Sequence, residues 1–96
     1  MCFCKTKSLR FKQFIFELDD DTLKFFRNIS DFTQDVPSFE HDIFEIHFQL
    51  GSTEKCKQTN DTYYALALVM KSDKLRLVYF SSNEVRRKWY TFLLKR

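Results

Sequence analysis

The residues of this chain whose types could support catalysis or metal binding are two histidines and three cysteines. His41 and His47 have no nucleophile at a spacing that indicates a catalytic pair, and His47 falls on the outward side of an alternating segment. Cys2, Cys4 and Cys56 match no known spacing of zinc ligands. With no signal peptide before them, these cysteines are typical of reduced thiols in a cytoplasmic protein. We expect no catalytic residue and no metal site here.

Two further features exclude other kinds of site. The acidic run Asp19–Asp21 offers oxygen ligands for a cation, but no EF-hand spacing follows it, and it is typical of a hairpin turn. The single glycine, Gly51, excludes a glycine-rich phosphate loop and the glycine-containing signature of an RNA-recognition sheet. We therefore expect no enzyme activity, no cofactor and no nucleic-acid partner.

Basic residues gather at the two ends of the chain, and acidic residues gather between them. Residues 1–16 carry four bases and no acid, residues 17–61 carry eleven acids and four bases, and residues 62–96 carry eight bases and two acids. The net charge is only +3. Such a chain is expected to fold into an electrically polarised body that orients in the field of a charged partner. Ordinary solvated surface charge is the alternative.

Alternating apolar residues predict six or seven antiparallel strands that would position these charges. In residues 10–18, Lys12, Phe14, Phe16 and Leu18 fall on one face. The DDDT and KSDK segments predict tight turns. Residues 29–41, which hold the only proline, form the longest predicted loop. The expected strands cover residues 1–6, 10–18, 22–28 and 42–50, a short piece near Lys55–Lys57, and the segments YYALALVM and KLRLVYF.

The end of the chain changes to a helical period. Four apolar residues at i, i+4, i+7 and i+8 predict an amphipathic helix over about 82–95: Val85, Trp89, Phe92 and Leu93. Ser81 is the predicted N-cap, with Glu84 three positions on. The predicted outer face carries Arg86, Arg87 and Lys88, and we consider it a second candidate surface, for an acidic patch of a protein partner.

The order of these elements resembles the pleckstrin homology (PH) domain over nearly the whole chain. CFCK resembles a first strand that ends in a lysine, here Lys5. FKQFIFELDDDTLKFF looks like the second and third strands, and LVYFSSNEVRRKW is similar to the last strand and the start of the helix, with Trp89 at the characteristic tryptophan. The resemblance implies one PH-like domain over residues 1–96, whole or part of a longer protein. It also implies a mainly β fold, a bent antiparallel barrel of about seven strands capped by the helix.

The resemblance further implies a headgroup-binding mouth between the first two strands. Lys5 and Lys12 match two bases of the family's lipid-binding motif, but Phe14 stands where the motif has a second base on strand two. A phenyl ring offers no hydrogen-bond donor to a phosphate. Nearby bases could compensate, so the candidate headgroup-binding residues are Lys5, Lys7, Arg10, Lys12 and Lys24.

Two functions follow from the resemblance. In the first, the chain is a non-catalytic binding module that recruits its parent protein to phosphoinositide headgroups or another anionic membrane surface. It would then be cytoplasmic, peripheral at a membrane, and monomeric as an isolated domain. In the second, it is a protein–protein interaction or scaffold domain, of the kind found in signalling adaptors, whose lipid site is degenerate at Phe14.

Overall fold

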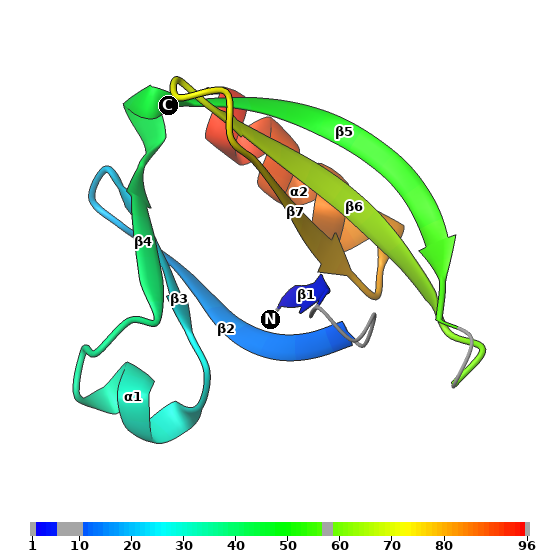
Figure 1. Ribbon diagram of the computed structural model, residues 1–96, viewed down its shortest axis with the longest axis horizontal. Coiled ribbons are helices and arrows are strands. Elements are labelled where there is room, and N and C mark those ends of the chain that lie inside the picture. Colours follow the sequence, from blue (N-terminus) through cyan, green and yellow to red (C-terminus); the bar gives the residue numbers. More distant parts are fainter. Residues whose placement is uncertain (1, 6–10, 57–58, 96) are drawn as a thin grey trace.

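The computed structural model describes residues 2–5, 11–56 and 59–95, and within them the chain is mainly β (Figure 1). Seven strands form one antiparallel sheet in the order β4-β3-β2-β1-β7-β6-β5. The sheet is bent but not closed, because β4 and β5 remain its two edges. The strands are β1 (Cys2–Lys5), β2 (Phe11–Asp19), β3 (Thr22–Phe26), β4 (Phe39–Asp42), β5 (Ile46–Lys55), β6 (Thr62–Met70) and β7 (Leu75–Phe80).

Two tight turns lie where the sequence predicts hairpins. Asp20, between β2 and β3, has a φ of 55°, and Asp73, between β6 and β7, has a φ of 63°. Aspartate tolerates this left-handed conformation better than most residues, because its short side chain bonds to the local backbone. The predicted hairpins at DDDT and KSDK are therefore confirmed.

Alternation along β2 decides which residues enter the core. Phe14 and Phe16 are buried on the inner face, and the strand register places Phe16 opposite Phe25 of β3. The ring centroids of Phe16 and Phe25 lie 4.9 Å apart, and those of Phe25 and Phe39 lie 4.5 Å apart. A continuous stack of rings thus joins β2, β3 and β4, and it explains why so small a domain carries so many phenylalanines.

Helix α2 (Asn83–Leu94) packs against β5, β6 and β7 and confirms the predicted C-terminal helix. Its N-cap is Ser82, whose hydroxyl accepts a hydrogen bond from the backbone N–H of Val85 at 3.3 Å. The predicted N-cap, Ser81, is wrong by one residue. The first helical residue is Asn83, and the capping residue directly precedes it.

Trp89 lies in the middle of α2 and is partly buried against the core. Its ring centroid is 4.5 Å from that of Phe16 and 6.0 Å from that of Phe92. The indole therefore covers the end of the aromatic stack, as the sequence predicts, while part of it remains accessible to solvent.

The segment predicted as the longest loop, residues 29–41, is not irregular throughout. It contains helix α1 (Ile29–Thr33) and the first residues of β4. The side chain of Asn28 caps α1 by accepting a hydrogen bond from the N–H of Asp31 at 2.8 Å. One helical turn is too short to show a hydrophobic period, which is why periodicity missed it.

The strand predicted over residues 42–50 begins later, at Ile46. Residues Ile43–Glu45 form the 3-10 turn η1, in which the side chain of Asp42 accepts a hydrogen bond from the N–H of Phe44 at 2.9 Å. This turn interrupts the alternation. As a result Ile43 is buried, whereas Phe44, which unbroken alternation with Phe48 would place on the inner face, is 61% exposed.

Gly51 lies in β5, where the pairing with β6 shifts register between Leu50 and Thr53. A Cβ atom at this position would come within 2.9 Å of the Cβ of Ala65, closer than two carbon atoms pack. The backbone of Gly51 is not left-handed. Lack of space beside β6, rather than an unusual backbone conformation, therefore requires glycine here.

The described architecture is a bent seven-stranded antiparallel sheet with a helix at the C-terminal end of the chain. This arrangement matches the PH-like fold predicted from the sequence. It differs from the predicted barrel in one respect, since the two edge strands β4 and β5 do not pair with each other.

The stacked rings predict where the stability of the fold resides. Phe25 is fully buried between two neighbouring phenylalanines, so Phe25→Ala should lower the free energy of unfolding by about 3–5 kcal/mol. Leu75→Ala, at a position 60% exposed, should change it by less than about 0.5 kcal/mol. Urea unfolding followed by Trp89 fluorescence measures both, and equal effects would contradict the core described here.

Candidate functional site

The predicted headgroup-binding mouth is described only in part. Lys7 and Arg10 lie outside the described residues, and of Lys5 the structure describes only the backbone, which pairs with Phe11. Lys12 is exposed at the start of β2, opposite Cys4 of β1. Of the bases predicted for this mouth, Lys12 is thus the one whose side chain the structure describes at the β1–β2 pair.

Position 14 belongs to the core. Phe14 is 8% exposed, and its ring centroid lies 5.4 Å from that of Phe39 on β4. The ammonium nitrogen of Lys12 is 5.8 Å from the centroid of the Phe14 ring, within the range of a cation–π contact. The ring that replaces the motif's second base therefore supports the packing between β2 and β4.

Lys24 does not lie with Lys12. The register of β2 and β3 places Lys24 opposite Glu17, on the outer face of the sheet, whereas Lys12 shares the inner face with Phe14 and Phe16. The Lys24 ammonium lies 2.8 Å from Asp19 Oδ2 and 3.0 Å from Asp35 Oδ1. Hydrogen bonds to these two carboxylates, Asp19 first, raise the pKa of Lys24 above its ordinary value. Its charge is already compensated within the chain.

Arg86 is not on the exposed helix face where the sequence analysis placed it. Only 7% of its surface is exposed, and one guanidinium nitrogen donates hydrogen bonds to the backbone oxygens of Gly51 (3.0 Å) and Ala65 (3.1 Å). The other terminal nitrogen donates to Asn83 Oδ1 at 2.7 Å. Burial, and then the charge of Arg87, lower the pKa of Arg86 from its ordinary value.

The buried stripe of α2 is therefore rotated from the predicted one. Arg86 and Leu93, seven residues apart, are its buried residues. The rotation leaves two predicted core residues outside, since Val85 is 40% and Phe92 is 47% exposed. The helix thus buries a cation and exposes apolar surface, the reverse of what amphipathicity alone favours.

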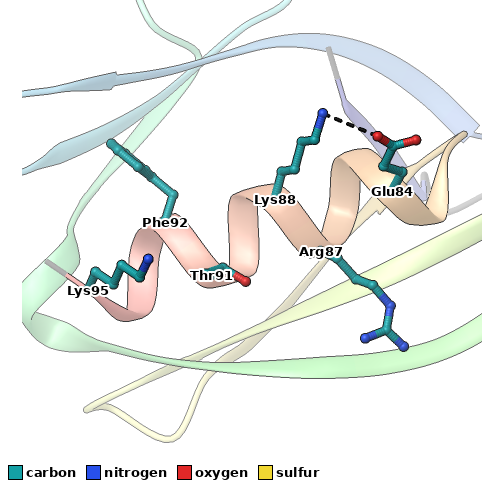
Figure 2. Close-up of a pocket in the computed structure, with 6 residues that line it drawn as sticks. All are labelled: Glu84, Arg87, Lys88, Thr91, Phe92 and Lys95. Carbon is teal, nitrogen blue, oxygen red and sulfur yellow. Dashed lines mark ion pairs between the residues drawn. The ribbon is translucent and has the colours of Figure 1, made fainter.

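The exposed side of α2 carries two adjoining depressions, which together we name the α2 groove. One, of about 370 Å³, is lined by Val85, Lys88, Trp89 and Phe92. The other, of about 440 Å³, is lined by Glu84, Arg87, Lys88, Thr91, Phe92 and Lys95 (Figure 2). Figure 2 shows Lys88 reaching back to Glu84, with a nitrogen–oxygen distance of 3.2 Å, and Arg87 leaving the helix on another side. Together the linings are apolar at Val85, Trp89 and Phe92 and mainly cationic at Arg87, Lys88 and Lys95.

A second exposed apolar surface lies on and after α1, and the sequence analysis missed it. We name it the α1 patch, formed by Ile29, Phe32 and Val36, which are 69%, 39% and 53% exposed. The N–H of Val36 donates to the backbone oxygen of Asp31, so the chain folds back beside the helix. Asn28 followed three residues later by Asp31 is a helix-start signature that could have revealed this element.

Two further polar residues, Arg76 of β7 and His41 of β4, lie on the inner face, and His41 Nε2 and Arg76 Nε are buried without a hydrogen-bond partner among the described residues. The Arg76 guanidinium lies 3.9 Å from the centroid of the Phe39 ring, so it bridges the two strands across the open side of the sheet. Burial, and then the charge of Arg76, lower the pKa of His41. His47 is exposed, as predicted.

Other expected features have plain structural roles. Asp20 and Asp21 form the β2–β3 turn, where the backbone oxygen of Asp21 accepts a hydrogen bond from the N–H of Ile43.

The three cysteines, all within the described residues, form no disulfide. The described part of the chain contains no group of three or more histidine, cysteine or acidic side chains that could hold a metal ion. Nor does it contain a membrane-spanning helix, which would need about 20 residues where α2 has 12.

The contacts of Arg86 predict a large penalty for its removal. Arg86→Leu would remove the donor from the buried backbone oxygen of Ala65 and from the partly buried oxygen of Gly51, and hydrogen bonds to a charged group contribute about 1.5–3 kcal/mol each. We expect a loss of about 3 kcal/mol or more in urea unfolding. Arg86→Lys should recover only part of it, because an ammonium lacks the planar fork. The neighbour Arg87→Leu is the matched control, and equal losses at both positions would contradict the rotated stripe.

The environment of His41 predicts how stability depends on pH. Because its folded-state pKa lies below the unfolded value of about 6.5, the unfolded chain binds more protons there as the pH falls. The contribution of His41 to the free energy of unfolding should therefore be fully present above about pH 6.5 and be lost as the pH falls below it. His41→Phe should flatten this decline, and His47→Phe should not. Unfolding curves recorded from about pH 7.5 to 5 measure the free energy of unfolding at each pH. If this free energy falls as steeply with pH in His41→Phe as in the wild type, His41 is not the group responsible.

Comparison with known proteins does not add a function to these surfaces. The chain matches no model of a known protein family, and searches of curated proteins and of solved structures gave no match.

Proposed function

We propose that this chain is a non-catalytic docking module that binds a protein segment along the α2 groove. The observation that carries the proposal is the rotation of α2, which buries Arg86 and leaves Val85 40% and Phe92 47% exposed. The hydrogen bonds of Arg86 to the sheet fix this rotation, and as a result Val85 and Phe92 add apolar area to the side of the helix that faces solvent. Adjoining exposed apolar side chains rimmed by polar ones are typical of protein interfaces.

The charges around the groove indicate the partner's chemistry. Arg87, Lys88 and Lys95 stand at its margins, and the acid that lines it, Glu84, already pairs with Lys88. A complementary segment would be apolar on one side and acidic on its flanks. Opposite charge at the rim mainly speeds association and selects the partner, while buried apolar and aromatic groups supply most of the affinity.

Phosphoinositide recruitment through the β1–β2 mouth has less support from the described residues. Phe14 is part of the core, and Lys24 lies on the opposite face of the sheet with two carboxylates as partners. Lys12 alone offers an exposed ammonium there among the described side chains. Headgroup binding is therefore kept as the contrasting outcome of the experiment below.

The test uses Trp89, the only tryptophan of the chain, which lines the groove. The probe is a synthetic amphipathic helix with leucine on one face and glutamate on the other. Its addition should change Trp89 emission saturably, and the affinity should fall as salt is raised. Arg87→Glu with Lys88→Glu should weaken binding by about tenfold or more, which is 1.4 kcal/mol or more.

The matched control reverses two exposed lysines that do not line the groove, Lys55→Glu with Lys71→Glu. It changes the net charge equally and should leave the affinity nearly unchanged. In a parallel arm, the wild type and Lys12→Ala are sedimented with phosphatidylcholine vesicles that contain a phosphoinositide. No peptide binding, together with vesicle binding that Lys12→Ala abolishes, would overturn the proposal in favour of headgroup recognition.

A further inference from the structure

The α1 patch and the α2 groove are both apolar, but acidic groups surround the patch whereas cationic groups line the groove. Its apolar residues follow one another at a helical spacing, with Ile29 and Phe32 three positions apart and Val36 folded back by its bond to Asp31. Phe32 rests edge-on against Phe26 of β3, with ring centroids 5.2 Å apart, so the patch is held on the sheet. An anchored, exposed apolar surface of this kind marks an interaction site.

Acidic groups surround this patch. Asp35 follows α1 and has a side chain 66% exposed, while Asp19, at the end of β2, is 57% exposed. Both contact the same cation, Lys24, so their pair keeps a net negative charge. Glu40 is exposed on the neighbouring strand β4, in register with Lys24. Arg27 is also exposed beside α1, but it pairs with Asp31 at 2.6 Å and the two charges cancel. The surface around the patch therefore keeps a net negative charge, in agreement with the excess of acids over residues 17–61.

The two surfaces belong to different parts of the molecule. Figure 1 shows α1 beyond the ends of β3 and β4, whereas α2 lies along β5, β6 and β7. One surface is apolar with acidic surroundings, and the other is apolar with cationic margins. Because they lie on separate elements, both can be used at once by two neighbouring molecules.

We infer that the segment bound in the α2 groove is the α1 patch of a second copy of this chain. The inference rests on the proposed function and names its partner. Charge complementarity within one sequence selects this occupant, since Asp19 and Asp35 face solvent on one surface and Arg87 and Lys88 on the other. The contact is heterologous, joining unlike surfaces, so a dimer still offers a free groove on one copy and a free patch on the other.

A heterologous contact predicts assembly that grows head to tail. The average mass in solution should rise with protein concentration, whereas a two-fold contact would stop at a dimer. Ionic screening should reverse the assembly, because opposite charges contribute to it. The isolated domain would thus be a monomer only when dilute or at high salt.

The experiment uses two variants, each lacking one surface, in sedimentation velocity. The groove variant carries Arg87→Glu with Lys88→Glu. The patch variant carries Ile29→Gln with Val36→Gln, at positions exposed enough to leave the core intact. Each variant alone should remain monomeric. Their equimolar mixture should form a one-to-one dimer that grows no further, because each partner contributes the one surface it retains.

A matched control removes equally exposed apolar residues elsewhere, Phe44→Gln with Leu75→Gln, which are 61% and 60% exposed, and should assemble like the wild type. A wild type that stays monomeric near millimolar concentration, or a mixture that does not pair, overturns the inference. If the acidic peptide still binds the groove in that case, only the self-association fails and the proposed function stands. Failure of both assays overturns both proposals.

Discussion

The inner-face stack of aromatic rings is the constraint on which the rest of this structure depends. Once Phe16 and Phe25 face each other across β2 and β3, the pairing register is fixed, and every neighbouring side chain is assigned to one face or the other. In this register Phe14 is buried on the inner face and Lys24 lies on the outer face. A cation on β3 therefore cannot join the inner-face Lys12 without breaking the stack. The same packing that stabilises the domain separates the bases of the expected lipid site.

The orientation of α2 follows from a second constraint, the supply of hydrogen-bond donors to the sheet. The backbone oxygens of Gly51 and Ala65 accept their hydrogen bonds from Arg86, at the place where β5 and β6 shift register. A buried polar group must be paired, and this requirement outweighs the gain from burying Val85. The side of the helix that faces solvent is set by what the sheet needs, and the apolar α2 groove is the result.

Much of the fold could be predicted from the sequence, because strand alternation and turn residues are local signals. The hairpins around Asp20 and Asp73, the position of α2 and the inward Trp89 all follow from such signals. The single turn α1 and the break at η1 could not, since elements this short show no period. For the candidate site, the sequence analysis placed Arg86, Arg87 and Lys88 on the outer face of α2, but Arg86 is buried. Helical spacing does not reveal two unsatisfied carbonyls on a distant hairpin, so burial of an arginine looks unfavourable until the sheet is known. The α1 patch was missed for the same reason, because it depends on how a capped turn rests on Phe26.

The hydrogen bonds of Arg86 also determine how α2 can detach from the sheet. The first turns of α2 cannot leave the sheet without removing Arg86 from the carbonyls of Gly51 and Ala65, and the last turn is held by Leu93, which is 4% exposed. The helix is therefore fixed to the sheet near both of its ends, and local opening should detach it as a unit rather than turn by turn. A helix fixed in this way presents its outer side as a preformed surface, which lowers the entropy cost of binding.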